Sequence, residues 1–410
     1  MFDLDSFPAV PERRVAVRVT KDALRQIRGG HPWVYADSVT SGDTSAPAGS
    51  LAVVFDDNRA FAAIGLWDPD SPIRVRILHA GKPLTIDDRY WAGVVDAAVA
   101  TRQPLRGTNT TGYRVLFGEN DGVGALIADR YADTLVIKVY SVAWYPHLRP
   151  VIAELAAMQG VDRIVLRLSR NVAEAPQTVA LGLVDGMVLL GPEVTGPVLF
   201  LENGLTFEAD VLHGQKTGHF LDQRDNRQWI RSVADDASVL DVFSCTGGFS
   251  VYAAAGGARF VHAVDISAPA IATAKRNLEH NTEQVGHVGF TSTVGDAFEV
   301  MAAQRDANER YDIVVIDPPS FARRASEKDR AIRAYRKLSE LGVGLVKPGG
   351  RLLQASCSAH VSANDLAGVV RAAVQSQERT ANDERITGHA LDHPVSFRQG
   401  QYLSAISLLL

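Results

Sequence analysis

The C-terminal half of the chain alternates short apolar runs with helix-like stretches, and this alternation restricts the possible folds more than any other feature. From about residue 200 the apolar runs are "SVLDVFS", "RFVHAVDIS", "VGFTSTVGD", "YDIVVIDPP", "GGRLLQAS" and "QYLSAISLLL". Strands that alternate with helices form βαβ units around a parallel sheet. Ligands of such open sheets bind beyond the carboxyl ends of the strands, so the residues that follow each run are the candidate site residues.

Two smaller regions precede this part of the chain. Residues 13–86 hold short β-rich segments separated by turn-forming stretches such as "SGDTSAPAGS", which predicts a small barrel-like β module. Residues 87–199 combine helical and strand patterns and predict a small α+β domain. Residues 200–410 then form a Rossmann-like α/β domain, so we expect three domains in an α/β protein.

Composition excludes several classes of protein. The longest apolar runs, such as Val251 to Ala255, fall far short of the roughly 20 residues that a membrane span needs. The first residues carry acids where a signal peptide carries positive charge, so we expect a cytoplasmic protein with no membrane partner. Two cysteines in 410 residues, without ligand spacing, predict neither a disulfide framework nor a metal site.

Carboxylates stand at three successive predicted strand ends. Asp241 precedes a turn of small residues with Gly247, Asp265 ends the second run, and Asp296 ends the third. An acid after the second strand can hold ribose hydroxyls, and no Walker lysine follows the glycines to hold a triphosphate. The set therefore predicts an adenosine ligand with little negative charge, S-adenosylmethionine (SAM). The alternative is that each carboxylate only caps a helix.

The fourth and fifth runs deliver Asp317, in the stiff loop "IDPPSF", and Cys357, in "LLQASCS", to the same edge of the sheet. Methyl transfer to one class of target atom needs a thiolate. That atom is carbon 5 of a pyrimidine, which is too poor a nucleophile to take a methyl group from SAM directly. Thiolate attack at carbon 6 makes carbon 5 nucleophilic, and an acid at the ring N3 edge stabilises the adduct. This chemistry assigns Cys357 as nucleophile and Asp317 as acid.

Cys245 is the weaker candidate for the nucleophile, because it lies in the turn that should pack against the cofactor. With strand order 1-4-5, the first and fifth strands lie about 10 Å apart, which also argues against a disulfide between Cys245 and Cys357. A buried, inert Cys357 is the alternative interpretation.

These motifs together resemble a known family. "DVFSCTGGFSV", "VDIS", "DPPSF" and "SCS" are similar to the motifs of the RlmI-type bacterial methyltransferases, which make 5-methylcytosine in large-subunit (23S) ribosomal RNA. "HGQKTGHFLDQRDNR", "DHPV" and "QYL" extend the resemblance. "GHPWVY" and "RVRIL" look like the family's PUA module, an RNA-binding β barrel. The resemblance covers nearly the whole chain.

The resemblance implies a class I methyltransferase domain after a PUA domain and a connecting α+β domain. Carried over by position, it implies Cys357 and Asp317 as catalytic residues. The implied SAM-binding residues are Thr217, Phe220, Gln223, Asp241, Phe243, Ser244, Gly247, Asp265, Ile266, Asp296, Ala297 and Asp317. The chain departs from the family pattern at Cys245, where a Tyr is expected, and at Ser320, where a Lys is common.

RNA is the expected partner, and a homodimer is a candidate assembly. The net charge of −5 argues against a general nucleic-acid coating protein, but a local basic cluster follows the "DPPSF" loop. Its candidate RNA-binding residues are Arg323, Arg324, Arg330, Arg333 and Lys337. The alternatives are methylation of a guanine or adenine nitrogen without covalent catalysis, a non-catalytic RNA-binding protein with a methyltransferase fold, and a small-molecule methyltransferase, which leaves two domains unexplained.

Overall fold

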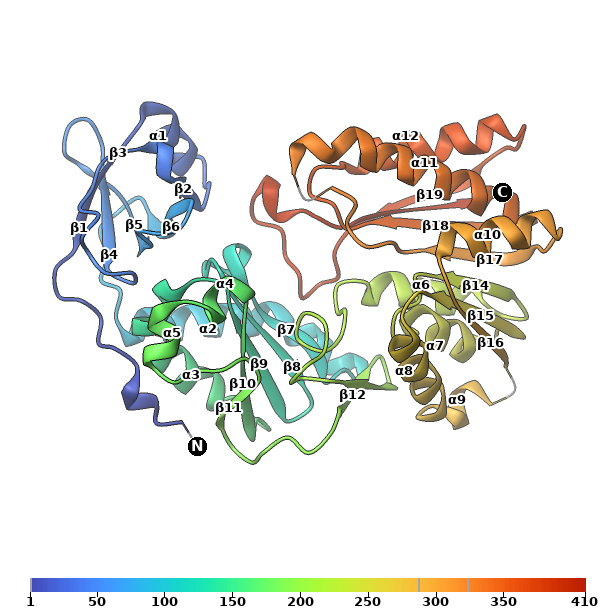
Figure 1. Ribbon diagram of the computed structural model, residues 1–410, viewed down its shortest axis with the longest axis horizontal. Coiled ribbons are helices and arrows are strands. Elements are labelled where there is room, and N and C mark those ends of the chain that lie inside the picture. Colours follow the sequence, from blue (N-terminus) through green and yellow to red (C-terminus); the bar gives the residue numbers. More distant parts are fainter. Residues whose placement is uncertain (1, 287, 323) are drawn as a thin grey trace. The chain divides into compact units, whose positions relative to one another are not determined.

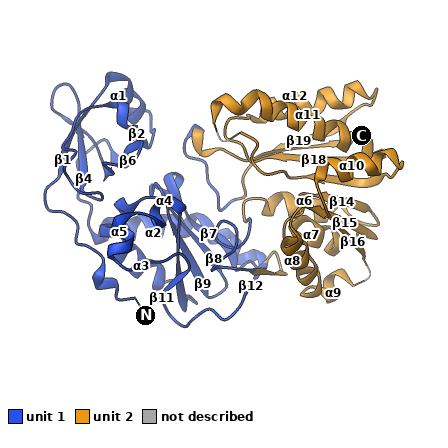
Figure 2. Cartoon of the chain, viewed as in Figure 1, with its two compact units in different colours: residues 1–201, 209–220, 391–398 blue, residues 202–208, 221–390, 399–410 orange. Residues whose placement is uncertain are grey.

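The computed structural model describes residues 2–286, 288–322 and 324–410, and the chain divides into two compact units (Figures 1 and 2). The first unit runs to Leu201 and also holds Ala209–Phe220 and Leu391–Arg398. The second unit holds Glu202–Glu208, Leu221–Ala390 and Gln399–Leu410.

Unit 1 contains two sheets. The elements of the first are β1 (Val15–Val19), α1 (Lys21–Arg28), β2 (Trp33–Tyr35), β3 (Val39–Ser41), β4 (Leu51–Phe55), β5 (Phe61–Trp67) and β6 (Ile73–Ala80), with strand order β2-β6-β5-β4-β1-β3. The elements that follow are α2 (Asp88–Arg102), β7 (Gly112–Phe117), β8 (Leu126–Tyr131), β9 (Thr134–Val139), α3 (Leu148–Ala156), β10 (Arg163–Leu168), α4 (Arg170–Ala173), α5 (Pro176–Ala180) and β11 (Met187–Leu190). Their strands form the sheet β11-β10-β9-β8-β7.

The predicted β module and α+β region are both present in unit 1. Helix α1 illustrates how local sequence sets an element: the Thr20 side chain accepts a hydrogen bond from the N–H of Ala23, and the helix ends before Gly29. Its buried residues, Ala23, Leu24 and Ile27, fall on one face and pack into the core of the first sheet. The short strands β2 and β3 were not predicted, because a strand of three residues is too short to show the alternation of apolar and polar side chains.

Strands β12 (Val198–Glu202) and β13 (Leu205–Ala209) lie where the two units meet in sequence. The further elements of unit 2 are α6 (Arg224–Val233), β14 (Ser238–Val242), α7 (Gly248–Ala255), β15 (Phe260–Asp265), α8 (Ala268–Glu279), α9 (Thr282–Val285), β16 (Gly289–Val294), α10 (Ala297–Asp306), β17 (Tyr311–Ile316), α11 (Lys328–Leu345), β18 (Val346–Ser356), α12 (Ala363–Ser376), β19 (Asn382–Thr387) and β20 (Ser404–Leu409). The 3₁₀ helices of the chain are η1 (Leu4–Ser6), η2 (Ala36–Ser38), η3 (Gln103–Thr108), η4 (Gly118–Asp121), η5 (Val142–His147), η6 (Ala325–Glu327) and η7 (Arg398–Gly400).

The sheet of unit 2 has the order β16-β15-β14-β17-β18-β20-β19. Strands β14 to β18 pair in parallel, and β20 pairs antiparallel with β18 and with β19. Helices α7 and α8 cover one face, and α10, α11 and α12 the other (Figure 1). The Rossmann-like fold and the adjacency of the first, fourth and fifth strands are therefore confirmed. The chain reverses its order between β14 and β17, which is where such sheets bind ligands.

Helix α11 packs closely on this sheet. A Cβ atom at Gly342 would stand 2.6 Å from Ile316 Cδ1 and 3.0 Å from Leu352 Cδ1, so the absence of a side chain allows the close approach. Within the described ranges, no helix is both long and apolar enough to cross a membrane.

Candidate active site

The turn after β14 is held against β15 by hydrogen bonds from two of its backbone N–H groups. The N–H of Ser244 donates to Val264 O at 3.0 Å, and the N–H of Cys245 donates to Asp265 Oδ2 at 2.9 Å. Phe243 and Cys245 adopt φ of 61° and 48°, which costs a residue with a side chain about 1 kcal/mol or more. The hydrogen bonds maintain this left-handed backbone, so the turn is a preformed part of the strand edge.

Gly247 completes the turn with φ of 76°, directly before α7. A Cβ atom there would stand 2.7 Å from Ala274 Cβ on α8, so this position tolerates no side chain. Packing against α8 therefore requires glycine at this position of the turn.

Buried acceptors beside the turn fit a cofactor with hydrogen-bond donors. Asp241 Oδ2 accepts from the N–H and hydroxyl of Ser250 at 2.9 and 2.6 Å, whereas Asp241 Oδ1 and Ser244 Oγ are buried without a partner among the described residues. A buried oxygen without a partner is costly, so both oxygens suit an ammonium or hydroxyl of a ligand. Burial, reinforced by the negative charge of Asp265, raises the pKa of Asp241 to about 6.

The next two strand ends supply the remaining cofactor candidates. Asp265 is half-buried, and its Oδ1 accepts from the N–H of Ser267 at 2.8 Å. Ile266 beside it is 74% exposed, an apolar surface open to a flat ring. Asp296 is the N-cap of α10, accepting from the N–H groups of Phe298 and Glu299 through Oδ1.

Ala297 is buried as the first residue of α10. Thr217 and Phe220 belong to unit 1, and the Thr217 hydroxyl there donates to Asp129 Oδ2 at 2.5 Å and lies 3.0 Å from the hydroxyl of Tyr131. The ring of Phe220 lies 4.5 Å from Lys216 Nζ. The predicted SAM-binding residues of unit 2 thus lie at one edge of its sheet. Thr217 and Phe220 belong to unit 1.

Gln223 faces Asp317. Its Nε2 donates to Asp317 Oδ1 at 2.9 Å, while its Oε1 accepts from Asn226 Nδ2 at 2.7 Å. Asn226 Oδ1 in turn accepts from the hydroxyl of Thr387 on β19 at 2.7 Å. Gln223 was predicted as a SAM-binding residue, and in the structure its amide donates to the candidate acid.

Asp317 lies in a setting that favours its protonated form. Burial, then the negative charge of Asp222, raise the pKa of Asp317 to about 7, against the opposing hydrogen bond from Gln223 and the charge of Arg227. Tyr402 holds Asp222 in place, because its hydroxyl donates to Asp222 Oδ2 at 2.7 Å. Sequence reasoning noticed "QYL" and "HFLDQRDNR" as motifs but gave Asp222, Asn226 and Tyr402 no role.

Cys357 follows β18 directly and is half-buried. Its Sγ donates to Pro318 O in the loop after β17, over 3.6 Å, so the thiol and the Asp317 loop are neighbours. Neither Cys245 nor Cys357 is in a disulfide, so both sulfurs are thiols. Burial and the charge of Asp265 raise the pKa of Cys245 to about 11, which leaves Cys245 protonated near neutrality and makes it a poor source of thiolate.

The basic candidates lie on and before α11. Arg324, Arg330, Arg333 and Lys337 are exposed, and Lys337 Nζ lies 5.2 Å from the centroid of the Phe298 ring. Arg323 lies outside the described residues. The three candidate cations on the helix, Arg330, Arg333 and Lys337, are spaced i, i+3 and i+7 and share one face.

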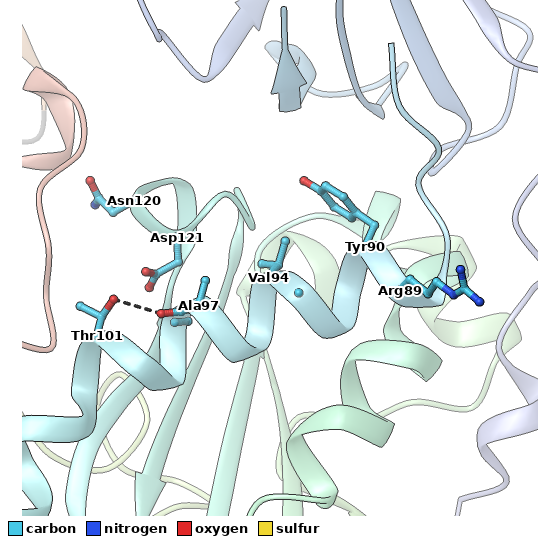
Figure 3. A pocket seen from close by; sticks show the side chains of 9 residues that line it. Arg89, Tyr90, Val94, Ala97, Thr101, Asn120 and Asp121 are labelled. Carbon is cyan, nitrogen blue, oxygen red and sulfur yellow. Dashed lines mark hydrogen bonds between the residues drawn. The ribbon is translucent and has the colours of Figure 1, made fainter. Parts of the chain in front are cut away.

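A pocket of about 530 Å³ in unit 1 contains none of the predicted site residues (Figure 3). It lies along α2, and three of its polar side chains already form hydrogen bonds: Tyr90 to Leu78 O, Thr101 to Ala97 O and Asp121 to Arg102. Across the described part of the chain, no group of three or more His, Cys, Asp or Glu residues could hold a metal ion.

Comparison with known proteins identifies two matching families. Residues 190–392 match the S-adenosylmethionine-dependent methyltransferase model, and residues 17–80 match a PUA-like domain. Two solved structures share the fold: a SAM-dependent methyltransferase from Streptococcus mutans (TM-score 0.79, 22% identity, 96% of this chain and 100% of that chain) and a methyltransferase in complex with SAH (TM-score 0.80, 22% identity, 97% and 100%).

Curated relatives match over nearly the whole chain. A ribosomal RNA large subunit methyltransferase of Deinococcus radiodurans is 47% identical over 98% of this chain and 99% of the relative. The ribosomal RNA large subunit methyltransferase I of Shewanella frigidimarina is 33% identical over 96% and 98%. These matches confirm the resemblance seen in the motifs, the PUA-like N-terminal domain and SAM as the cofactor. The chain therefore belongs to the SAM-dependent methyltransferase family that includes the ribosomal RNA large subunit methyltransferases.

Proposed function

We propose that this protein methylates carbon 5 of a cytosine in large-subunit ribosomal RNA, with Cys357 as nucleophile and Asp317 as acid. The RNA class is inferred from the names of the two relatives. The observation that carries the choice of atom is the meeting of a thiol and a carboxyl at neighbouring strand ends, with Cys357 Sγ 3.6 Å from Pro318 O beside Asp317.

The thiol provides the activation that carbon 5 needs. The Cys357 thiolate forms a bond to carbon 6, and the electron pair displaced from the 5,6 double bond makes carbon 5 nucleophilic. Bound SAM supplies the electrophilic methyl group. Removal of the carbon 5 proton by a base then restores the double bond, and the bond between Sγ and carbon 6 breaks to return the thiolate.

Asp317 provides the proton at the ring edge. A carboxyl whose pKa is near 7 still holds a proton close to neutral pH, and it can donate to a ring nitrogen as charge develops there. N3 of cytosine is an acceptor, whereas N3 of uracil carries a hydrogen. A neutral Asp317 therefore favours cytosine over uracil, because the O–H of Asp317 and the N3–H of uracil are both donors and cannot form a hydrogen bond with each other.

Each candidate cofactor residue of unit 2 would bind a different part of SAM. Asp265 would take the ribose hydroxyls, and the buried oxygens of Asp241 and Ser244 would take further donors of the ligand. Exposed Ile266 offers an apolar surface to the adenine ring. Asp296, whose Oδ1 caps α10, would use its second oxygen for the adenine amino group.

Asp265→Ala should weaken SAM binding by roughly 1.5 to 3 kcal/mol, because it removes charge-assisted hydrogen bonds to the ribose. Isothermal titration calorimetry measures the change. Asp306→Ala, at the exposed end of α10, is the matched control and should leave the affinity unaltered. Equal affinities in the two variants would remove Asp265 from the binding site.

Exposed Arg330, Arg333 and Lys337 of α11 are the proposed RNA-binding cations, and replacing all three with Ala should weaken RNA binding and flatten its salt dependence. Each lost phosphate contact lowers the slope of log affinity against log salt by about 0.7 to 0.9. Filter binding across a salt series gives the slope. The control is a variant with exposed Lys275, Arg305 and Arg310 replaced together. An unaltered slope in the α11 variant would show that the three α11 cations make no phosphate contact.

Cys357→Ala should abolish methylation while SAM affinity stays near that of the wild type, because the thiol acts on the base and not on the cofactor. Mass spectrometry of nucleosides from an unmodified 23S ribosomal RNA transcript, after incubation with labelled SAM, identifies the product. RNA carrying 5-fluorocytosine should trap the wild type covalently, since the fluorine cannot leave as a proton.

Cys245→Ser should still form this adduct, even where its SAM affinity is reduced. Activity in Cys357→Ala, together with no adduct in the wild type, would instead indicate methylation of a base nitrogen. SAM binding without any methylated product would favour a non-catalytic RNA-binding protein.

Adduct formation needs Asp317 protonated and Cys357 ionised, so its rate should show a falling limb at the alkaline end of a pH series, where Asp317, whose pKa is raised to about 7, has lost the proton that it donates. Asp317→Asn should lose the falling limb and react about 10²- to 10⁴-fold more slowly, since an amide cannot deliver the proton. Single-turnover measurements between pH 5.5 and 9 test this, and an unchanged falling limb in Asp317→Asn would exclude Asp317 as the acid.

A further inference from the structure

The two serines that flank Cys357 share one hydrogen-bond partner. Ser356 Oγ donates to the hydroxyl of Tyr335 at 2.8 Å, and Ser358 Oγ lies 3.3 Å from the same oxygen. Tyr335 is fully buried on the inner side of α11. One phenol oxygen therefore holds the side chains on both sides of the nucleophile.

Ser358 extends this contact to the loop that carries Asp317. Its Oγ lies 2.9 Å from Ser320 Oγ and accepts from the N–H of Ala322 at 3.3 Å. The Cys357 thiol contacts Pro318 O in the same loop at 3.6 Å. The turn with the nucleophile and the loop with the acid are thus joined at two places, and Ser320, a departure from the family pattern, has a partner here.

Tyr335 is itself fixed from two directions. Its backbone carbonyl accepts from Gln354 Nε2 on β18 at 3.2 Å, and Gln354 is completely buried. Its ring packs against Phe321 with centroids 5.1 Å apart. A phenol held by its backbone and its ring has little freedom to move, so its oxygen is a stable reference point for the two serines.

We propose that Tyr335 is a positioning residue, whose hydroxyl acts through Ser356 and Ser358 to keep the Cys357 thiol in place beside the Asp317 loop. This inference rests on the proposed function, because thiol placement matters only where Cys357 attacks the base. Attack requires the reacting atoms to come within about 3 to 3.5 Å in the correct direction, and misplacement by about 1 Å can cost 100-fold in rate.

Tyr335→Phe tests the proposal, because it removes the hydroxyl and retains the ring. The single-turnover rate of methylation should fall about 10- to 100-fold, while the KM for RNA and the Kd for SAM stay at wild-type values. The rate of adduct formation with 5-fluorocytosine RNA should fall by the same factor. Ser358→Ala should act in the same direction, and the double variant should lose less than the product of the two single losses, since both act through one network.

Tyr311→Phe is the matched control. Tyr311 is also buried in unit 2, but it stands at the opposite end of β17 from Asp317, and its hydroxyl donates to Glu309 Oε2 at 3.0 Å. This variant should keep the wild-type rates. The proposal would be overturned if Tyr335→Phe lost no more rate than Tyr311→Phe. It would also be overturned if Tyr335→Phe lost SAM affinity by the same factor as rate.

Two further outcomes separate this inference from the proposed function. A trapped wild type together with Tyr335→Phe that traps at the same rate overturns the positioning role alone. An untrapped wild type with an active Cys357→Ala overturns both proposals. If Tyr335→Phe does not fold, Ser356→Ala and Ser358→Ala decide instead: slower adduct formation in both supports the proposal, and wild-type rates in both overturn it.

Discussion

The parallel sheet of unit 2 determines where charged groups can meet a ligand. Strands β14 to β18 run in one direction between helices, so their carboxyl ends share one edge while their faces are covered. Because the order reverses between β14 and β17, Asp241 and Asp317 come from adjacent strands. Burial, then the charge of Asp222, raise the pKa of Asp317, and the charge of Asp241 on the adjacent strand adds to them, so the topology contributes to the near-neutral pKa of Asp317.

The nearest strong cation does not cancel this effect. Arg227 is buried and lowers the pKa of both Asp241 and Asp317, but its guanidinium already forms a two-point ion pair with buried Glu202, at 2.8 and 2.7 Å. A cation neutralised by its own carboxylate exerts only a weak field on a second one. Asp222, held by Tyr402, adds a further negative charge, so Asp317 lies where a proton is retained near neutrality.

Most strand ends could be predicted from the sequence, because each apolar run stops at a residue with chemical function. The parallel order, the glycine turn and the place of Cys357 followed from that pattern. Strand β19 was not found, since its residues are almost all exposed and polar and have no apolar period. The orientation of Gln223 towards Asp317 and the roles of Asn226 and Tyr335 were also beyond prediction, because they depend on contacts between residues far apart in the chain.

Helix α11 has an exposed basic face and a buried face that packs on the sheet. Its exposed cations face solvent, while Tyr335, two positions from Arg333 and from Lys337, lies on the buried side. Gly342 lets the helix approach β17 and β18 closely, and Gln354 Nε2 donates to the carbonyl of Tyr335, so the helix packs on the strands that lead to Asp317 and Cys357. A phosphate contact on the outer face would thus be made by the same helix that packs against the strands leading to Asp317 and Cys357. Bound RNA would therefore be placed relative to Cys357 through one rigid helix rather than through a flexible loop.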